Sequence, residues 1–558
     1  MIRRPRRLRG GLTALIAVVA LALTACTGFA TSGPVNAGLA AGDAAPPDFS
    51  FVPLKPQDGA SPEDIVRGFL DAGNGPENNW AIAQLFLAPS FRDKWKPAAG
   101  VTVDDRSNRQ YGKVIDGRMT VTVSSTATVD QHGAYAPSEG GSTPLTFSLA
   151  KVGGQWRITD APNGVVLGAD QFASVFRPYS LMYFDPSWRY LVPDVRWFAT
   201  ANAATRIAQE LIDGKPSSWL GDSVVSAFPE NISLDLPSVP LSSGVAQVEL
   251  RGPVLGLETT TLDRMQTQLV RSLQSAAITD VSMSSSGTPL SAQLVSTAST
   301  RTDARALVDT EKGFGFLSST GAIEPVPGVS TGMTKVTPDS VELAADYSAA
   351  AVRTTDGAVV RVPARGDPTL VDGRPGLIDP TIDPYGYIWS VPGSLPKALR
   401  AYGSQGGYIE TGAGWIGVSS VSSMAISRDG TRLAALVTLS GRPRVIVAGV
   451  VRNAAGVPQS IGTVVELAML PGAGIDLTWL DDATLGVVSN AGDEVSAMEQ
   501  PVGGPATTTT APNGATTIAG GAIVRLRVGS ALYAQRGSNW EQAGTGVRVL
   551  ATQQGMPQ

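Results

Sequence analysis

The sequence predicts a multi-domain protein in which two α+β domains are followed by an all-β propeller of five to seven blades. The 558 residues are too many for one hydrophobic core and indicate roughly three or four domains. The 62 glycines and 39 prolines indicate frequent turns and few helices. Similar hairpin patterns recur in the second half, where Ile426 follows Ile382 by 44 residues and Trp479 follows Ile426 by 53. Repeats of about 40 to 50 residues are typical of propeller blades.

The charge balance argues against nucleic acid as a partner. The chain carries a formal net charge of -5, although its first 26 residues contain five arginines and no acidic residue. The remaining residues therefore carry 38 basic and 48 acidic side chains, a net charge of -10. Because phosphate binding depends on clustered lysine and arginine side chains, we expect no general nucleic-acid binding.

The N-terminal segment has the features of a bacterial export signal that ends at the only cysteine, Cys26. Five arginines precede an apolar run from Leu12 to Leu23, which is too short to span the roughly 30 Å hydrocarbon core of a bilayer. The run ends in Leu-Thr-Ala-Cys at residues 23–26, which resembles the lipobox of bacterial lipoproteins.

The lipobox resemblance implies a signal peptide over residues 1–25, cleavage between Ala25 and Cys26, and lipid attachment at Cys26. The thiol of Cys26 would carry S-diacylglycerol, and the new amino terminus an N-acyl group such as palmitate. Since stable anchoring takes two chains, the resemblance implies a protein held at the extracytoplasmic face of the cell membrane. The alternative is an inert cysteine in a transmembrane helix. A lipidated Cys26 leaves no cysteine for a disulfide.

An N-terminal α+β domain is predicted over residues 56–170. It follows a flexible tether at residues 26–55, where glycine, proline and small residues dominate. The first helix is expected to begin where Ser61 can act as a cap and Pro62 occupies the first helical position. Alternating apolar and polar residues within 119–162 then predict antiparallel strands.

The order of helices followed by a curled sheet resembles the cone-shaped fold of nuclear-transport-factor type. Some members of that fold bind ligands in a pocket. The resemblance makes Trp80, Trp95 and Trp156 candidates to line such a pocket, and packing in the core is the alternative interpretation.

An aromatic bridge is predicted over residues 171–202, between the first two domains. Its aromatic side chains are Tyr179, Tyr183, Phe184, Trp188, Tyr190, Trp197 and Phe198. Three prolines interrupt this segment, which favours a strap packed on neighbouring domains over a regular element. A ligand platform is the alternative interpretation.

Residues 203–298 resemble a GerM-type domain, which is common in exported proteins. A helix is expected from about Ala204 to Asp213, where the following glycine and proline end it. A strand at residues 244–250 and a helix-to-strand link at residues 268–281 complete the resemblance. No catalytic residues are attributed to GerM-type domains, so the resemblance implies none here.

Residues 299–558 are predicted to form the propeller. In residues 424–437, two apolar strands flank a polar turn at 427–430, which is the pattern of a blade hairpin. The aspartate-glycine pair in this turn resembles TolB-type propellers. Residues 501–517 have low complexity and are predicted to be a disordered insert.

Two motifs match catalytic or cofactor sites but lack the context that those sites need. Gly328–Gly332 matches a nucleophile elbow, yet the only histidine, His132, precedes it and is expected in an exposed hairpin turn without an evident partner. Gly412–Gly417 matches a dinucleotide loop, yet a strand-like sequence follows where a helix is required. We therefore predict a protein without enzymatic activity, cofactor or metal. Scattered carboxylates leave glycoside chemistry open.

The order of lipobox, α+β domain, GerM-type domain and propeller resembles the LpqB family of actinobacterial lipoproteins over nearly the whole chain. This resemblance implies a lipoprotein that binds the extracytoplasmic domain of an MtrB-like sensor histidine kinase and modulates an MtrAB-type two-component system. The alternative is an envelope protein that binds or processes glycans in the propeller cleft.

Overall fold

The computed structural model describes residues 53–138 and 140–557. They belong to one compact unit, residues 51–558. The predicted signal peptide, Cys26 and most of the tether lie outside the described residues. Within the described ranges, no helix is both long enough and apolar enough to cross a bilayer.

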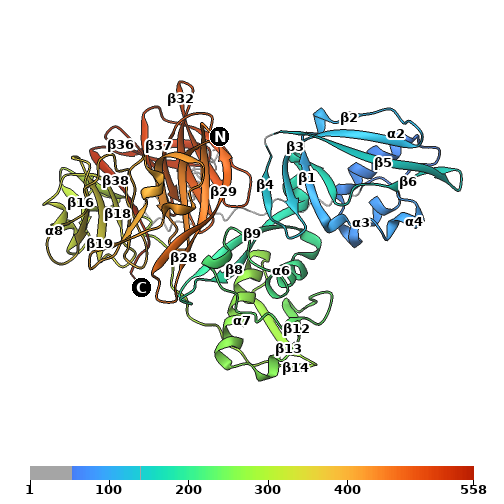
Figure 1. Cartoon of the computed structure of the whole chain (residues 1–558), viewed down its shortest axis with the longest axis horizontal. Coiled ribbons are helices and arrows are strands. Elements are labelled where there is room, and N and C mark those ends of the chain that lie inside the picture. The colour runs from blue at the N-terminus through green and yellow to red at the C-terminus, as the bar shows by residue number, and fades with distance from the viewer. Residues whose placement is uncertain (1–52, 139, 558) are drawn as a thin grey trace, which may run out of the picture. The chain divides into compact units, whose positions relative to one another are not determined.

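The N-terminal domain is an α+β fold in which a curved sheet packs on short helices, as predicted. Figure 1 shows α2, α3 and α4 gathered on one face of this sheet. The sheet has the strand order β6-β5-β3-β1-β7, and β2 and β4 also pair with β3. Its elements are α2 (Pro62–Asp71), α3 (Glu77–Gln84), α4 (Pro89–Arg92), β1 (Gly100–Asp104), β2 (Gln110–Tyr111), β3 (Arg118–Asp130), β4 (Tyr135–Pro137), β5 (Ser142–Val152), β6 (Gln155–Asp160), β7 (Val165–Gly168) and α5 (Ala169–Val175).

Local sequence explains how this domain forms. The hydroxyl of Ser61 accepts a hydrogen bond from the backbone N–H of Asp64, whose carboxylate accepts one from the backbone N–H of Ser61. This reciprocal pair satisfies two backbone donors that a helix start leaves free. Along β3, alternate side chains are buried, as a strand with one face on a core requires. The predicted helix start at Ser61 is confirmed.

The predicted aromatic bridge is a regular hairpin. Strands β8 (Phe176–Phe184) and β9 (Leu191–Ala199) pair in continuous antiparallel register. Their buried aromatic side chains belong mainly to the same core as α6 (Ala203–Ile212) and α7 (Thr259–Leu273). The three prolines of this segment suggested an irregular strap. They lie within the two strands or in the turn between them. Proline fits a two-stranded ribbon, because each strand has one edge without a hydrogen-bonded neighbour.

The second domain completes this core with a small sheet. Its strand order is β10-β12-β13-β14, and β11 also pairs with β12. Strands β12 and β13 are parallel, and α7 connects them. The strands are β10 (Ser233–Leu234), β11 (Leu241–Ser242), β12 (Val245–Arg251), β13 (Asp280–Ser285) and β14 (Thr288–Pro289).

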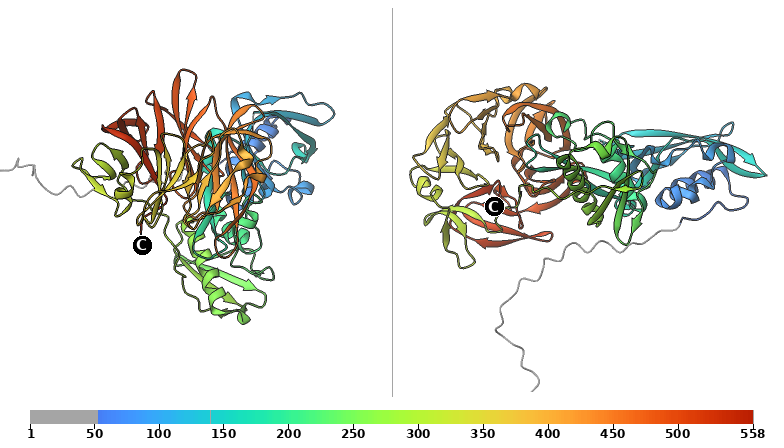
Figure 2. Two further views of the ribbon diagram at one scale, coloured as in Figure 1. Left: turned by 60° about the vertical axis from the view of Figure 1, so that its left-hand side comes forward. Right: turned by 90° about the horizontal axis from the view of Figure 1, so that it is seen from below.

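The C-terminal domain is a propeller of six four-stranded blades. The right-hand view of Figure 2 shows its sheets arranged in a ring. The C-terminal strand β38 (Val547–Gln553) joins β15, β16 and β17 in one blade and pairs in parallel with β18 of the next, which closes the ring. A helix, α8 (Val329–Met333), lies between the first two blades in the sequence.

The remaining strands of the propeller follow in chain order. They are β15 (Leu307–Thr310), β16 (Gly313–Leu317), β17 (Ile323–Pro325), β18 (Pro338–Leu343), β19 (Ala349–Thr354), β20 (Val359–Pro363), β21 (Thr369–Asp372), β22 (Thr381–Ile382), β23 (Ile388–Ser390), β24 (Arg400–Tyr402), β25 (Tyr408–Glu410), β26 (Val418–Ile426), β27 (Arg432–Leu439), β28 (Arg442–Arg452), β29 (Pro458–Met469), β30 (Gly474–Trp479), β31 (Thr484–Ala491), β32 (Glu494–Pro501), β33 (Thr507–Ala511), β34 (Ala515–Ala519), β35 (Arg525–Val528), β36 (Ala531–Arg536) and β37 (Asn539–Gly544).

The prediction of a disordered insert at residues 501–517 is wrong. This segment contains β33, which pairs along its whole length with β32, and the start of β34. Four successive threonines form most of β33, and β-branched residues suit a strand. The low-complexity sequence wrongly indicated disorder, because an outer strand of a blade needs few apolar side chains.

Candidate functional site

His132 has a partner that its sequence context did not reveal. Its Nδ1 atom lies 3.1 Å from Oε2 of Glu210, and its side chain is about half exposed. The other oxygen of Glu210 accepts a hydrogen bond from Arg206 (2.9 Å). The expected exposed turn is present, but 78 residues separate the two partners, so no local motif could have linked them.

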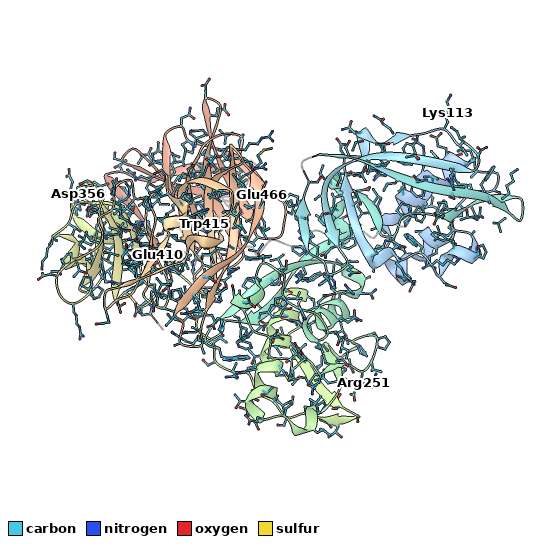
Figure 3. All side chains as sticks on the ribbon, in the orientation of Figure 1. Lys113, Arg251, Asp356, Glu410, Trp415 and Glu466 are labelled. Atoms are coloured by element: carbon cyan, nitrogen blue, oxygen red, sulfur yellow. The ribbon has the colours of Figure 1, made fainter. Side chains whose placement is uncertain are left out.

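Neither of the two sequence motifs forms the catalytic or cofactor site that its pattern is typical of. In Gly328–Gly332, the hydroxyl of Ser330 donates to the carbonyl oxygen of Phe314 (2.7 Å) and accepts from the backbone N–H of Val326. In Gly412–Gly417, a 3-10 turn leads into strand β26, and Trp415 is almost fully buried within the propeller (Figure 3). Across residues 53–138 and 140–557, no group of three or more histidine, cysteine, aspartate or glutamate side chains is placed to hold a metal ion.

The N-terminal domain contains an apolar cavity of about 230 Å³, which we call the N-terminal cavity. Helix α2 and strands β1, β3, β5 and β7 contribute its walls. Of the three candidate tryptophans, Trp95 lines it, and Trp80 and Trp156 do not. Trp80 is buried in the core, where its indole N–H donates to the carbonyl oxygen of Gly73, and Trp156 is half-buried.

A larger cleft of about 560 Å³ lies where three parts of the unit meet, and we call it the junction cleft. The N-terminal domain contributes β4 and the turn before it, the hairpin contributes β9, and the propeller contributes β29 and the end of β32. Beside the cleft, the indole N–H of Trp197 donates to the carbonyl oxygen of Gly503 (2.7 Å), which ties the hairpin to the propeller. Trp219 packs against both the second core and the propeller.

A buried ion pair holds the wall of the junction cleft in place. Arg196 and Asp194 are 2% exposed and lie 2.8 Å apart. Burial alone would lower the pKa of Arg196, but the adjacent Asp194 carboxylate outweighs it and leaves that pKa raised. The guanidinium also donates to the carbonyl oxygens of His132 and Lys215, which ties the first domain to the turn after α6.

Two strands at sheet edges line the junction cleft. Strand β29 is the outermost strand of its blade, and β4 pairs on one side with β3. Edge strands present unpaired backbone N–H and C=O groups that an added strand can use. A β-bulge at Leu467 interrupts β29, since Val445 pairs with Ala468 and Ile446 pairs with Glu466. Bulges often occur beside functional sites.

Four carboxylates line the junction cleft, those of Asp130, Asp194, Asp213 and Glu466, together with the two basic side chains of Arg196 and Lys215. Asp194 is paired with Arg196, and Glu466 is paired with Arg444. Lys215 is exposed and forms no ion pair with any residue that the structure describes. Its ammonium group is therefore available to an incoming carboxylate.

Comparisons with known proteins place both end domains in one family. A family model described as the N-terminal domain of lipoprotein LpqB matches residues 55–173, and one described as the LpqB beta-propeller domain matches residues 315–550. The chain is similar to the propeller protein TolB of Acinetobacter baumannii in structure, with a TM-score of 0.30 and 14% identity over 37% of this chain and 55% of that chain.

Curated relatives named Lipoprotein LpqB come from several actinobacteria. The chain is 31% identical to the Bifidobacterium longum protein, in a match that covers 37% of this chain and 38% of the relative. It is 30% identical to the Thermobifida fusca protein, in a match that covers 46% of this chain and 43% of the relative. It thus spans less than half the length of these two relatives. The similarity to the Streptomyces coelicolor protein covers 86% of this chain and 87% of the relative at 26% identity. The predicted family is confirmed, and the chain belongs to the LpqB family of lipoproteins.

Proposed function

We propose that this chain is an anchored envelope lipoprotein that binds the extracytoplasmic domain of an MtrB-like sensor histidine kinase and modulates its signalling. The name of its relatives supports an envelope lipoprotein. The order of the domains resembles that of the LpqB family, and this resemblance implies the kinase partner. The junction cleft supports this proposal, because it offers a surface to which a partner can bind.

The junction cleft is the observation that carries this proposal. Its apolar side chains include Tyr135, Trp219 and Leu467, and its rim carries the unpaired Lys215. An extended segment of the partner can add to the edge of β29 or β4 through backbone hydrogen bonds, and an acidic side chain of that segment can meet Lys215. Pockets of this size are common where domains meet.

A lipid anchor makes a weak interface sufficient. If Cys26 is lipidated, the chain and the kinase share one membrane, which raises the effective concentration of each toward the other. Binding alters a kinase only if the chain prefers one of its conformations, because a ligand shifts an equilibrium by its differential affinity. A cleft lined by three packed parts of the unit suits this task.

The glycan alternative receives less support from the propeller. Trp389, Trp415 and Trp479 are buried and cannot stack on a sugar ring. The half-buried Trp540 lines a cavity of about 200 Å³, and the single carboxylate there, Glu499, accepts a hydrogen bond from Gln535. Glycoside hydrolysis ordinarily needs two carboxylates across the scissile bond.

The direct test is calorimetry with purified residues 51–558 and the extracytoplasmic domain of the kinase encoded in the same genome. Lys215→Glu should weaken binding at least tenfold, because it places a like charge at the acidic segment. Lys113→Glu makes the same charge change at an exposed site in the N-terminal domain and should leave affinity unchanged. Ser218→Trp in the cleft, with Ser242→Trp as its control, tests the shape of the site.

A cellular test addresses the anchor. Cys26→Ser should remove the protein from the detergent phase and reduce the effect on response-regulator phosphorylation, while the purified domain keeps its intrinsic affinity. Absence of binding at high micromolar concentration, together with unchanged phosphorylation after deletion of the whole protein, would overturn the proposed function. Binding that both cleft variants leave intact would instead place the partner on another surface.

A further inference from the structure

We infer that the N-terminal cavity is a binding site for a small, uncharged and mostly apolar molecule that carries one hydrogen-bonding group. The inference concerns the first domain alone and does not depend on the proposed kinase partner. The size, rigidity, polarity and charge of the cavity each limit what can bind there.

The floor of the cavity is a preorganised set of aromatic rings. Phe69 lies between Trp95 and Phe147, with ring centroids 5.0 and 6.1 Å away in edge-to-face arrangements. The indole N–H of Trp95 donates to the carbonyl oxygen of Pro162 (3.2 Å), which fixes its ring. All three aromatic side chains are buried. Edge-to-face packing of this kind holds side chains in place without filling the space above them.

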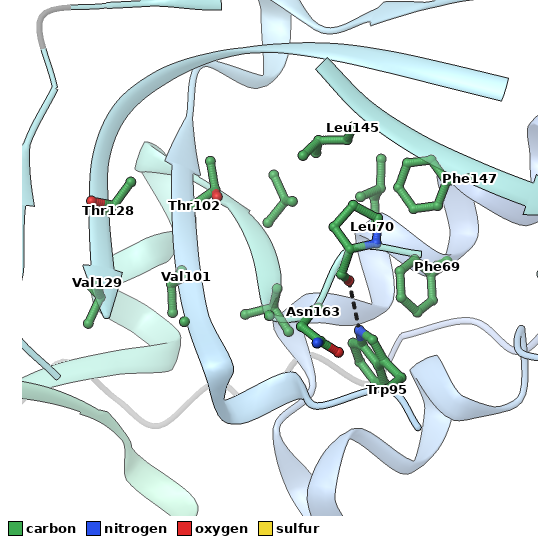
Figure 4. Close-up of a pocket in the computed structure, with 16 residues that line it drawn as sticks. Phe69, Leu70, Trp95, Val101, Thr102, Thr128, Val129, Leu145, Phe147 and Asn163 are labelled. Atoms are coloured by element: carbon green, nitrogen blue, oxygen red, sulfur yellow. Dashed lines mark hydrogen bonds between the residues drawn. The ribbon is translucent and has the colours of Figure 1, made fainter. Parts of the chain in front are cut away.

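Figure 4 shows the two threonines of the cavity across from these rings and its asparagine on the same side as Trp95. Thr102 and Thr128 are cross-strand neighbours on β1 and β3, and Asn163 lies beside Trp95. The side-chain oxygen of Asn163 accepts a hydrogen bond from the backbone N–H of Lys96, and its NH₂ group has no partner among the described residues. Thr128 and Asn163 are exposed, so the cavity reaches solvent where these two polar side chains lie.

The cavity offers no partner for an ionised group. None of its sixteen lining residues is charged. The nearby ammonium group of Lys96 donates instead to the carbonyl oxygen of Asp93 (3.0 Å). Since moving a carboxylate from water into an apolar site without a partner is very costly, the ligand must be neutral where it enters the cavity.

The volume sets the size of the ligand. Protein interiors pack closely and contain few voids larger than a water molecule. An engineered apolar cavity of about 150 Å³ stays dry and binds benzene. The N-terminal cavity, at about 230 Å³, is half as large again. It therefore has room for two fused rings or for a medium alkyl chain, with a hydroxyl or amide at Asn163 or the two threonines.

The test uses purified residues 51–558 without detergent, and neutral and ionised probes of matched shape. 2-Naphthol and 1-octanol should bind saturably in calorimetry, and 2-naphthoate and octanoate at least tenfold more weakly. Comparison of the two alcohols decides whether the natural ligand is a ring compound or an alkyl chain. Absence of saturable binding by both alcohols, or equal binding of the carboxylates, would overturn the inference.

Variants then locate the binding. Val165→Phe fills the cavity and should reduce the affinity for 2-naphthol at least tenfold, whereas Val114→Phe makes the same change at an exposed loop and should have no effect. Leu145→Ala enlarges the cavity and should retain binding, which keeps the inference testable if Val165→Phe does not fold. Unaltered binding by a folded Val165→Phe variant would show that the probes bind elsewhere.

Discussion

The N-terminal domain and the propeller are stabilised in different ways. The core of the first domain is mainly apolar, and at its edge Asp104 and Arg109 form a buried ion pair (2.6 Å). The propeller also buries charge, since Asp383 and Arg452 are fully buried and lie 2.6 Å apart. Asp429 and Arg432 form a second ion pair whose side chains are 1% exposed. The difference lies in what the buried pairs join: Asp104 and Arg109 are five residues apart in one domain, whereas Asp383 and Arg452 connect two neighbouring blades of the ring.

Two buried carboxylates illustrate how neighbouring blades are joined. Glu342 accepts hydrogen bonds from the hydroxyl of Thr381 (2.6 Å) in the next blade and from Gln554, which follows the closing strand. Asp476 accepts hydrogen bonds from the hydroxyl of Ser423 (3.0 Å) and the backbone N–H of Ile518 (2.9 Å), which belong to the blades on either side. Each carboxylate therefore contacts two neighbouring elements of the ring.

The largest expected effect comes from Asp383→Ala. This change leaves the buried guanidinium of Arg452 without its counter-ion and removes the acceptor for the indole N–H of Trp389 (2.9 Å). Breaking a buried pair typically costs about 3 to 5 kcal/mol. Denaturant unfolding, monitored by the fluorescence of the tryptophans in the propeller, measures this loss in the free energy of unfolding. Asp339→Ala removes one half-exposed partner of Arg353 and should cost less than about 1 kcal/mol. Equal losses of unfolding free energy in the two variants would contradict the expected difference between the buried and the half-exposed ion pair.

The second prediction concerns pH. Burial, and then repulsion from Asp379, raise the pKa of Asp476 to about 7, and burial also raises the pKa of Glu342. In the unfolded chain an aspartate ionises near pH 4, so between about pH 4 and 7 the folded chain binds more protons. Propeller stability should therefore be highest at acidic pH and fall as pH rises toward 7, until acid effects elsewhere intervene.

Melting temperatures between pH 4.5 and 8 measure this effect. Asp476→Asn should flatten the fall, because the amide does not titrate. Asp356→Asn, at an exposed turn, should leave the shape of the curve unchanged. A curve for Asp476→Asn that matches the unaltered protein would contradict the assignment of the titrating group.

The third prediction tests whether β33 is part of the propeller. Ala511 is 3% exposed and faces Val495 across the strand pair, so Ala511→Asp buries an unpaired carboxylate. We expect a loss of about 2 to 3 kcal/mol in the free energy of unfolding. Thr508→Asp places the same group on the exposed face and should have little effect. If both variants unfold like the original chain, the segment contributes no packing.

The smallest expected effect is that of His132→Ala. The side chain of His132 is half exposed, and Glu210 keeps its ion pair with Arg206 after the change. Because the His132 partner is half exposed and the buried Glu210 keeps its other partner, the loss in denaturant unfolding should be about 1 kcal/mol or less, and kinase binding should persist. A loss of several kcal/mol would mean that the contact with Glu210 anchors the first domain to the second.

Sequence patterns predicted those features that depend on neighbouring residues. The helix start at Ser61 follows from a capping box of four residues, and the strand β3 follows from strict alternation. The blade hairpin around Asp429 follows from two apolar runs and a polar turn. The insert at residues 501–517 was missed because composition alone does not indicate whether a partner strand is available.

The sequence by itself predicted the fold class, because local periodicity and short motifs carry that information, and the resemblance of its ordered domains to a known family predicted the family. Only the tertiary structure decided that there are six blades, that His132 meets Glu210, that Trp95 lines a cavity and Trp80 does not, and that two strands at sheet edges line the junction cleft. The physical reason is distance along the chain. Ring closure joins strands more than 200 residues apart, and cavities form where side chains from several elements fail to fill the space between them.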